Sequence, residues 1–326
     1  MTLFLNEAEV SQVATMEMAL EAVDEAFHGL GRGEAQVRPR QRIQLSSGSL
    51  HTLVGGLPSS RALGLKTYTV YGAPRFLVVL FDSENGELLS IMEADRLGQL
   101  RTGAASGIAT RYLAREDAAT VGLFGSGWQA RTRIEAVCAV RRIKQIRVYS
   151  RNRERREAFC REMGRQLGVE LVPIESGEAA VKGADVLITI TNAREPVLLG
   201  EWLAPGQHIN AAGSSRAREP ELDVEAVRRA DVVAADSVEQ AKIEAGDLVG
   251  AVAAGALTWE RVLELGDVVV GKHPGRASAD QITLFESLGL AVEDLALAAR
   301  VYRLAKARGL GREIEVFGPA GQAPRP

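Results

Sequence analysis

The sequence predicts an α/β fold in which a doubly wound parallel sheet is joined to a second, α+β unit with an antiparallel sheet. Two patterns carry this prediction. From Thr120 onward, apolar strands alternate with helical stretches, which indicates a parallel sheet covered by helices on both faces. Between Arg42 and Ile91, short strands are broken by Gly, Pro and Asn, which is typical of an antiparallel sheet.

The first part of the chain predicts a helix, the antiparallel sheet and a second helix. Residues 7–31 carry apolar side chains at helical spacing and end in closely spaced glycines, so we expect one amphipathic helix there. Asn85-Gly86 suits the positive φ angles of a tight turn and predicts a hairpin at residues 82–86. A long helix is expected over residues 93–113. The strands of this unit are expected at residues 50–54, 64–71 and 76–81.

The rest of the chain predicts the parallel sheet and its helices. The last helical pattern covers residues 279–307, and the tail 318–326 is expected to be disordered. These patterns divide the chain into one domain of residues 1–113 with 300–317 and a second domain of residues 114–299. Strands of the parallel sheet are expected at residues 120–124, 146–149, 186–190, 208–212, 232–235 and 268–270.

Composition narrows the class of protein. The chain has 326 residues, 46% hydrophobic and 25% charged, as in an ordinary globular protein, and its net charge of -3 does not favour nucleic acid binding. Cys138 and Cys160 have no metal-ligand neighbours at a useful spacing, so we expect no metal site and a cytoplasmic location. No signal peptide is apparent, and no apolar run approaches the roughly 20 residues that span a bilayer, so no membrane partner is expected.

A strand, a glycine turn and a helix start follow one another at residues 120–130. The turn reads Gly-x-Gly-x-x-Ala, with Gly125, Gly127 and Ala130 at the named positions. Gly125 permits the tight turn, Gly127 lets the backbone approach a pyrophosphate, and Ala130 lets the helix pack closely on the strand. The helix start then offers free N–H groups to phosphates. The motif therefore predicts a Rossmann-type dinucleotide site.

The end of the next strand predicts which dinucleotide is preferred. A carboxylate there would bind the ribose hydroxyls and favour NAD, but the sequence reads Ser150-Arg151-Asn152-Arg153. Two guanidinium groups could clamp a 2′-phosphate, so we predict a preference for NADP, with NAD as a second cofactor. The alternative that Arg151 and Arg153 start a solvated helix stays open. Cofactor contacts are predicted at Thr102, Gly125, Ser126, Gly127, Gln129, Ala130, Ser150, Arg151, Arg153, Thr189, Thr191 and Gly213.

A hydride-transfer enzyme also needs groups that hold the substrate and a proton donor. Lys66 lies within an apolar strand pattern, where a solvated lysine is less expected, and Arg101 opens a helix of small residues. Arg38, Arg40 and Arg42 are further candidate anion ligands. Each of these cations, taken alone, could equally be an ordinary surface charge.

Four motifs in order carry a resemblance to a known family. They read Arg-Thr-Gly-Ala at residues 101–104 with Ile-Ala-Thr-Arg-Tyr-Leu-Ala at 108–114, the glycine turn at 125–130, Asn-Ala-Ala-Gly-Ser-Ser at 210–215 with Glu-Pro-Glu-Leu-Asp at 219–223, and Thr-Leu-Phe-Glu-Ser-Leu-Gly-Leu-Ala-Val-Glu-Asp at 283–294. With these motifs the chain resembles the ornithine cyclodeaminase/mu-crystallin family over about residues 1–317. The resemblance implies a homodimer in which the antiparallel sheets of two chains form a shared barrel, with a Rossmann domain on each side.

The resemblance also implies how a substrate carboxylate is held. In the family an Arg, a Lys and the Arg of the Arg-Thr motif bind it, and by motif position these correspond to Arg42, Lys66 and Arg101. Arg38 and Arg40 lie close to Arg42, so which of the three arginines is the ligand stays open. Three cations that converge on one carboxylate suit an α-imino or α-amino acid.

Two departures from the family concern acidic residues. Members that cyclise ornithine carry an Asp at the place of Ser215 and a second acid near residues 53–57, where this chain reads Leu-Val-Gly-Gly-Leu. A basic side chain on the substrate would therefore lack its carboxylate partners, which is costly when it is buried. The alanine dehydrogenases of the family also use an Asp near Ser215. These departures favour reduction over deamination.

We therefore predict an NAD(P)H-dependent oxidoreductase that reduces small cyclic or linear α-imino acids, such as 1-pyrroline-2-carboxylate to L-proline. Lys66, or a water held by Ser215, would supply the proton. Two alternatives stay open. One is an ornithine cyclodeaminase or amino acid dehydrogenase in which Glu219 or Asp236 does the acid-base work. The other is an NADPH-dependent ligand-binding protein like mu-crystallin.

Overall fold

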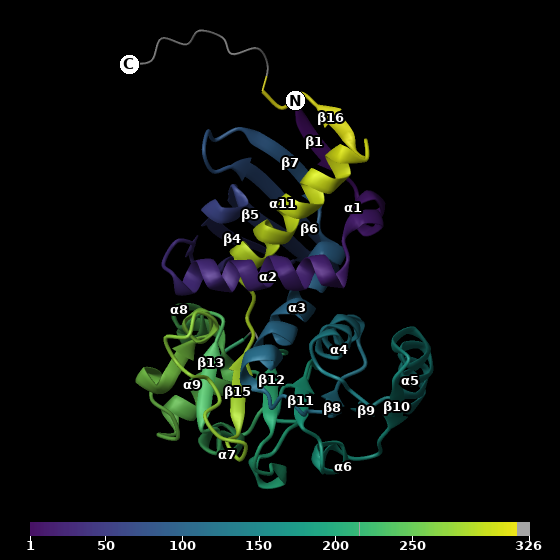
Figure 1. Cartoon of the computed structure of the whole chain (residues 1–326), viewed down its shortest axis with the longest axis vertical. Coiled ribbons are helices and arrows are strands. Elements are labelled where there is room, and N and C mark those ends of the chain that lie inside the picture. The colour runs from purple at the N-terminus through teal and green to yellow at the C-terminus, as the bar shows by residue number, and fades with distance from the viewer. Residues whose placement is uncertain (215, 318–326) are drawn as a thin grey trace.

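A computed structural model of the chain describes residues 1–214 and 216–317. It shows two lobes, one on a mixed, largely antiparallel sheet and the other on a parallel sheet (Figure 1). The predicted α/β fold class is thereby confirmed. Ser215 and the predicted tail 318–326 lie outside the described residues. Within the described part, no helix is long and apolar enough to cross a membrane.

The sheet of the first lobe contains the predicted strands and further short strands. They are β1 (Thr2–Leu5), β2 (Gln36–Val37), β3 (Gln41–Gln44), β4 (Ser49–Leu57), β5 (Ala62–Tyr71), β6 (Ala73–Asp82), β7 (Leu88–Glu93) and β16 (Arg312–Ile314). The order is β16-β1-β7-β6-β5-β4-β2, and β3 pairs with β4. The predicted hairpin is confirmed, because Gly86 has a φ of +75° and donates to the carbonyl of Asp82 at 2.8 Å.

Helices α1 (Glu7–Val13), α2 (Met16–Gly31) and α11 (Ala291–Ala307) complete this lobe. Helix α11 packs against β4, β5 and β6, and α2 packs against α11. The prediction of one helix over residues 7–31 is wrong. The backbone is extended at Ala14 and Thr15, and the Thr15 hydroxyl caps α2 by accepting from the Met18 N–H at 3.2 Å. A capping threonine therefore starts a second helix inside one apolar pattern.

The sheet of the second lobe is parallel throughout and has the order β10-β9-β8-β11-β12-β15-β13-β14. Its strands are β8 (Thr120–Phe124), β9 (Gln145–Tyr149), β10 (Glu170–Pro173), β11 (Val186–Thr189), β12 (His208–Ala211), β13 (Val232–Ala235), β14 (Val262–Glu264) and β15 (Thr283–Glu286). Phe124 pairs with Tyr149 on one side and Thr189 on the other. The carboxyl ends of β8, β9 and β11 therefore meet at one edge of the sheet.

Two predictions for this lobe are wrong. Residues 268–270 are not a strand, because α10 covers Leu265–Val269. Residues 279–307 are not one helix, because Thr283–Glu286 form β15, a central and fully buried strand. The helices here are α4 (Trp128–Val140), α5 (Arg153–Leu167), α6 (Gly177–Val181), α7 (Val224–Arg228), α8 (Val238–Glu244), α9 (Gly246–Ala253) and α10. Short 3-10 turns are η1 (Pro58–Ser60), η2 (Gly200–Trp202) and η3 (Trp259–Arg261).

Helix α3 (Asp95–Leu113) runs between the lobes and packs against α4 of the second lobe and α2 and α11 of the first (Figure 1). Its contact with α4 is close, since a Cβ at Gly103 would lie 2.4 Å from the carbonyl oxygen of Thr132. The predicted domain boundary at residue 300 falls inside α11. That helix packs on β4, β5 and β6 of the first sheet.

Candidate functional site

A cavity of about 710 Å³ opens beyond the carboxyl ends of β8, β9 and β11. Gly125, in the turn after β8, has a φ of +110°, and a Cβ there would lie 2.2 Å from the carbonyl oxygen of Ile190. Gly127 faces open space, with nothing within 4 Å of an added Cβ. The start of α4 has no side-chain cap among the described residues. This loop and helix N-terminus fit a dinucleotide pyrophosphate.

Most of the residues predicted to contact the cofactor line this cavity. Those on its wall are Gly125, Ser126, Gly127, Gln129, Ser150, Arg151 and Thr191. Ser126 and Ser150 share a hydrogen bond of 2.9 Å between their hydroxyls, which joins the glycine turn to the end of β9. Ala130 is buried inside α4 and Thr189 inside β11, so they support the wall from behind.

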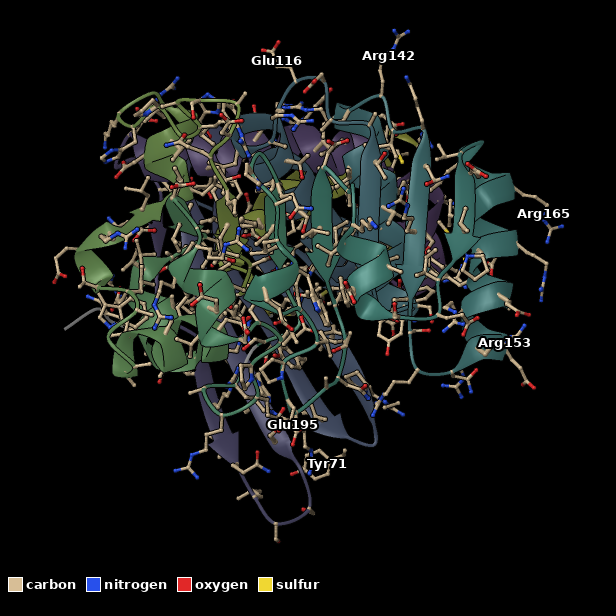
Figure 2. All side chains as sticks on the ribbon, turned by 90° about the horizontal axis from the view of Figure 1, so that it is seen from below. Tyr71, Glu116, Arg142, Arg153, Arg165 and Glu195 are labelled. Carbon is tan, nitrogen blue, oxygen red and sulfur yellow. The ribbon has the colours of Figure 1, made fainter. Side chains whose placement is uncertain are left out.

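Two arginines near the end of β9 line the cavity. Arg151 donates to Asn192 Oδ1 at 3.3 Å, and Arg155, in the first turn of α5, is the second. Arg153 is 74% exposed, pairs with Glu157 at 2.8 Å and points away from the body of the molecule (Figure 2). The structure thus places Arg155, which the sequence analysis did not select, where Arg153 was expected.

A buried carboxylate, Glu221, joins the ends of β11 and β12. Its Oε1 accepts from the Thr191 N–H at 2.5 Å, and its Oε2 accepts from the Gly213 N–H at 2.8 Å. A Cβ at Gly213 would lie 2.3 Å from Glu221 Oε2, so this close approach requires glycine. Burial raises the pKa of Glu221. Gly213 therefore supports the wall of the cavity through Glu221, a residue that the sequence analysis missed.

A smaller cavity of about 80 Å³ lies between β5 and the start of α3. Three cations line it, namely Arg40, Lys66 and Arg101. Gln129 lines both cavities, so the two are neighbours. The remaining lining residues are Leu53, Tyr68, Phe76, Ala94, Asp95, Gly98 and Thr102. Three cations next to the larger cavity, which carries the glycine turn, are suited to hold a small carboxylate there.

Lys66 is 3% exposed, and its Nζ donates to Asp294 Oδ1 at 2.8 Å. The same Nζ lies 5.2 Å from the centre of the Phe76 ring. Burial lowers the pKa of Lys66 to about 8, against the opposing effect of Asp294 and with the help of Arg101. An ammonium with this pKa is partly neutral near pH 8, so it can donate a proton and recover it.

Arg101 is held by two carboxylates at the start of α11. Its Nε donates to Asp294 Oδ1 at 3.0 Å, and its Nη1 donates to Glu293 Oε2 at 3.0 Å. Burial disfavours the charge of Arg101, but Asp294 and Glu293 outweigh it and raise its pKa above the ordinary value. Burial raises the pKa of Glu293 to about 8, although Arg101 opposes this.

Of the three arginines left open by the sequence, Arg40 lines the smaller cavity. It pairs with Glu244 of α8 at 3.3 Å and donates to the carbonyl of Leu288 at 2.5 Å. Arg42, on β3, pairs with the other oxygen of Glu244 at 2.5 Å, and Arg38 lines a separate pocket with Val54 and Gly64. Of these three arginines, Arg40 and not Arg42 is therefore among the residues that line the smaller cavity.

Among the described residues, one acid, Asp95, lines the smaller cavity, and the alternative acids Glu219 and Asp236 are not among its lining residues. Leu53 gives its wall an apolar side, as the sequence from residue 53 predicts, but Asp95 also lines it and was missed. Of the alternative acids, Glu219 pairs with Arg216 at 3.2 Å, and Asp236 is buried with its Oδ2 accepting from the Leu288 N–H at 2.6 Å. Asp236 therefore fixes a loop. Ser215 lies outside the described residues.

From the sequence, Arg40 stayed an open candidate beside Arg38 and Arg42, and Glu293 and Asp294 appeared only at the end of a motif, with no role in the site. A signal for the acids was present, because two adjacent carboxylates interrupt an apolar pattern at Ala291–Val301. Both are fully buried, which acids tolerate only when they are paired or protonated. Adjacent acids in a buried pattern therefore predict buried cations elsewhere in the chain.

Comparisons with known proteins match the chain to one family. The model of the ornithine cyclodeaminase/mu-crystallin family matches residues 1–309. The chain is 39% identical over 263 residues to Delta(1)-pyrroline-2-carboxylate reductase of Bacillus cereus, which covers 78% of this chain and 81% of that protein. It is similar to the structure of Thermococcus litoralis Delta(1)-pyrroline-2-carboxylate reductase in complex with NADH and L-proline, with a TM-score of 0.92, 35% identity and coverage of 96% and 100% of the two chains. It is also similar to an archaeal alanine dehydrogenase dimer with bound NAD, with a TM-score of 0.91, 35% identity and coverage of 97% and 99%.

Proposed function

Because this chain belongs to the ornithine cyclodeaminase/mu-crystallin family, we propose that it is an NAD(P)H-dependent reductase of small α-imino acids. The model reaction is 1-pyrroline-2-carboxylate to L-proline. One observation carries this proposal: the smaller cavity brings Arg40, Lys66 and Arg101 together beside a dinucleotide-shaped cavity. Its charges suit a single carboxylate.

The residues of the smaller cavity divide the work of the reaction. Arg40 and Arg101 hold the carboxylate, and we assign to Arg40 the part expected of Arg42. Lys66 contacts the carboxylate and donates a proton to the imine nitrogen. Leu53 and Phe76 exclude water from the reacting carbon. When bound, the reduced dinucleotide supplies the hydride.

Ser215 stays the candidate for holding a water near the imine nitrogen, as the sequence suggests. It follows Ser214, whose hydroxyl is buried and has no hydrogen-bond partner among the described residues. Thr102 lines the smaller cavity, so we place it beside the reacting end of the cofactor.

NADP is the preferred cofactor in this proposal, because Arg151 and Arg155 both line the cavity at the end of β9. The expected effect of Arg155→Ala is a rise of about 10-fold in the Michaelis constant for NADPH, with a smaller change for NADH, because a charge-assisted contact to the 2′-phosphate is lost. Initial rates with both cofactors measure this. Arg153→Ala is the matched control and should change the NADPH to NADH ratio less. A wild-type preference for NADH would overturn the assignment.

The chain acts as a homodimer in this proposal, through the face of the first sheet turned away from α11. Apolar side chains of β4, β5 and β6 are exposed there, at Leu50, Val54, Leu63 and Leu77. Val54 pairs with Leu65, and Leu65 pairs with Val79, so these strands present a continuous face. A second copy on this face gives the shared barrel, and the mass in solution measured by light scattering tests it. A monomeric mass would contradict it.

The reaction itself is tested by following NAD(P)H absorbance with a panel of substrates. The panel contains 1-pyrroline-2-carboxylate, 1-piperideine-2-carboxylate, pyruvate with ammonia or methylamine, and ornithine with NAD. We expect oxidation of NADPH with the cyclic imino acids. Ammonia release from ornithine without added reductant would support cyclodeamination instead, and no oxidation of NADPH by any imine would support a ligand-binding role.

A further inference from the structure

Asp294, at the start of α11, joins two cations that come from two other elements. Its Oδ1 accepts from Lys66 Nζ on β5 at 2.8 Å and from Arg101 Nε on α3 at 3.0 Å. The carboxylate is fully buried, and its Oδ2 has no hydrogen-bond partner among the described residues. A charged acceptor in this geometry fixes the direction of the ammonium and stabilises its charge.

The surroundings of Lys66 include groups that oppose its positive charge as well as the carboxylate that favours it. Burial disfavours the ammonium, and Arg101 and Arg40 repel it, while Asp294 favours it. The titratable and charged groups that face this part of β5 are Glu293 and Asp294 on α11, Arg101 and Asp95 on α3, Arg40 ahead of β3, His51 on β4 and Tyr68 on β5 itself. Asp294 contacts Lys66 directly, so it is the main support of the positive charge.

We propose that Asp294 is a positioning residue that keeps Lys66 charged and directed into the smaller cavity, where Lys66 serves as the proton donor. This rests on the proposed function. In the reduction, the C=N carbon gains a hydride, the C–N π bond breaks, and the nitrogen gains the proton of Lys66 while the dinucleotide is oxidised. Neutral Lys66 then recovers a proton from solvent. Asp294 has no contact with the substrate in this proposal; it acts through Lys66 and also holds Arg101.

Glu293 provides a matched comparison. It adjoins Asp294 in sequence and is equally buried, but its carboxylate contacts Arg101 through Oε2, and its Oε1 has no partner among the described residues. Replacing it removes a contact of Arg101 and leaves the ion pair of Lys66 in place. Glu293 therefore supports Arg101 alone, whereas Asp294 supports both cations, and the direct effect on Lys66 is expected only when Asp294 is replaced.

The experiment compares pH profiles of kcat for reduction of 1-pyrroline-2-carboxylate in wild type, Asp294→Asn and Glu293→Gln. The fall of kcat at alkaline pH, the alkaline limb, reports loss of the Lys66 proton. Titration of the substrate itself affects the wild type and both variants equally. We expect Asp294→Asn to shift this limb to lower pH by about one unit or more, since an opposite charge at this distance is removed. Glu293→Gln should mainly raise the KM for 1-pyrroline-2-carboxylate, and it should shift the alkaline limb less than Asp294→Asn does.

A second readout needs no turnover. Pyrrole-2-carboxylate is a planar carboxylate that the hydride does not reduce. Its binding to the dinucleotide-loaded protein is measured by calorimetry across the same pH range. As the pH is raised, the affinity for pyrrole-2-carboxylate should begin to fall at a lower pH in Asp294→Asn than in wild type. Asp294→Glu, which keeps the charge, should restore both profiles in part. If Asp294→Asn does not fold, Asp294→Ser, which leaves room for a water, takes its place.

The outcomes are distinct. An unchanged alkaline limb in Asp294→Asn, with a lower rate at every pH, would show that Asp294 is only structural. A shift of the same size in Glu293→Gln would also overturn the proposal. If the wild type reduces no imino acid, the proposed function fails, and the binding profiles still decide whether Asp294 supports the charge of Lys66.

Discussion

Lys66 is a charged residue in a buried sheet, and glycines make room for the cations of its cavity. A Cβ at Gly98 would lie 2.7 Å from Lys66 Nζ, and a Cβ at Gly289 would lie 2.2 Å from Arg101 Nη1. Gly289 also has a φ of +85°, which a residue with a side chain rarely adopts. The positions of the two cations therefore depend on the absence of side chains on α3 and on the loop before α11.

Lys66→Met should abolish imine reduction and leave dinucleotide binding intact. Methionine fills a similar volume but carries neither the charge nor the proton, so we expect a loss of at least about 100-fold in kcat. Steady-state rates and quenching of protein fluorescence by NADPH measure the two effects. Unchanged turnover would remove Lys66 from the mechanism.

Gly289→Ala should raise the KM of the imino acid on the order of 10-fold, because the new methyl group displaces the Arg101 guanidinium. Gly86→Ala is the matched control, since Gly86 also has a positive φ, of +75°, but an added Cβ there meets nothing within 4 Å. Both variants should lose stability, and Gly86→Ala should keep the wild-type KM. An equal KM in Gly289→Ala and wild type would contradict the assignment of Arg101.

The sequence predicted two of the three cations of the cavity, Lys66 and Arg101, and it left the third open. Lys66 and Arg101 stand in apolar or small-residue patterns, which makes a charge conspicuous. Arg38, Arg40 and Arg42 share one local pattern, and only the fold distinguishes them, because Arg40 lines the smaller cavity and Arg38 lines a separate pocket. Pairing across the fold, as between Lys66 and Asp294, has no local signal.

At the scale of elements, the contact between α3 and α4 links the two cavities. Arg101 is on α3, whereas α4 begins at the glycine turn of the dinucleotide cavity. The Thr132 hydroxyl donates to the carbonyl of Gln99 at 2.9 Å, and Gly103 lets the helix backbones approach.

The strands of the parallel sheet were mostly predicted because each is a bounded apolar run. Strand β15 was missed since a short buried run has no period that separates strand from helix.

Gly103→Ala should destabilise the protein by about 1–3 kcal/mol and lower kcat, because the methyl group meets the Thr132 carbonyl and the helices must move apart. Gly250→Ala, in the middle of α9, is the control. An added Cβ there meets nothing within 4 Å, so alanine should be neutral or stabilising. Urea unfolding measures both. A stable Gly103→Ala protein with wild-type kcat would show that the contact is adjustable.

At the scale of the whole molecule, buried acids gather behind the site at the carboxyl edge of the parallel sheet. Burial raises the pKa of Asp236 to about 6 and of Asp247 to about 7. Burial also raises the pKa of Glu286 well above its usual value, with repulsion from Asp247 and Asp236. The sequence could not reveal this group, because its members come from separate loops and strands that only the fold brings together.

The free energy of unfolding should fall between pH 6.5 and pH 8. Asp247, Glu286 and Glu293 hold protons in the folded state in this range, whereas the unfolded chain has released them, so raising the pH favours unfolding. Each group contributes at most about 1.4 kcal/mol per pH unit. Thermal unfolding across this range measures the trend. Glu293→Gln should reduce the slope, and a stability that rises with pH would contradict the prediction.

Helix α3 has a further consequence for the energetics of ligand binding. Since α3 lines the smaller cavity and packs on α4, which begins at the dinucleotide cavity, we expect the distance between the two cavities to change little when ligands bind. Little additional apolar surface is then buried when the ligands bind. We therefore expect a small change in heat capacity on binding, in contrast to proteins whose lobes shut around their ligands.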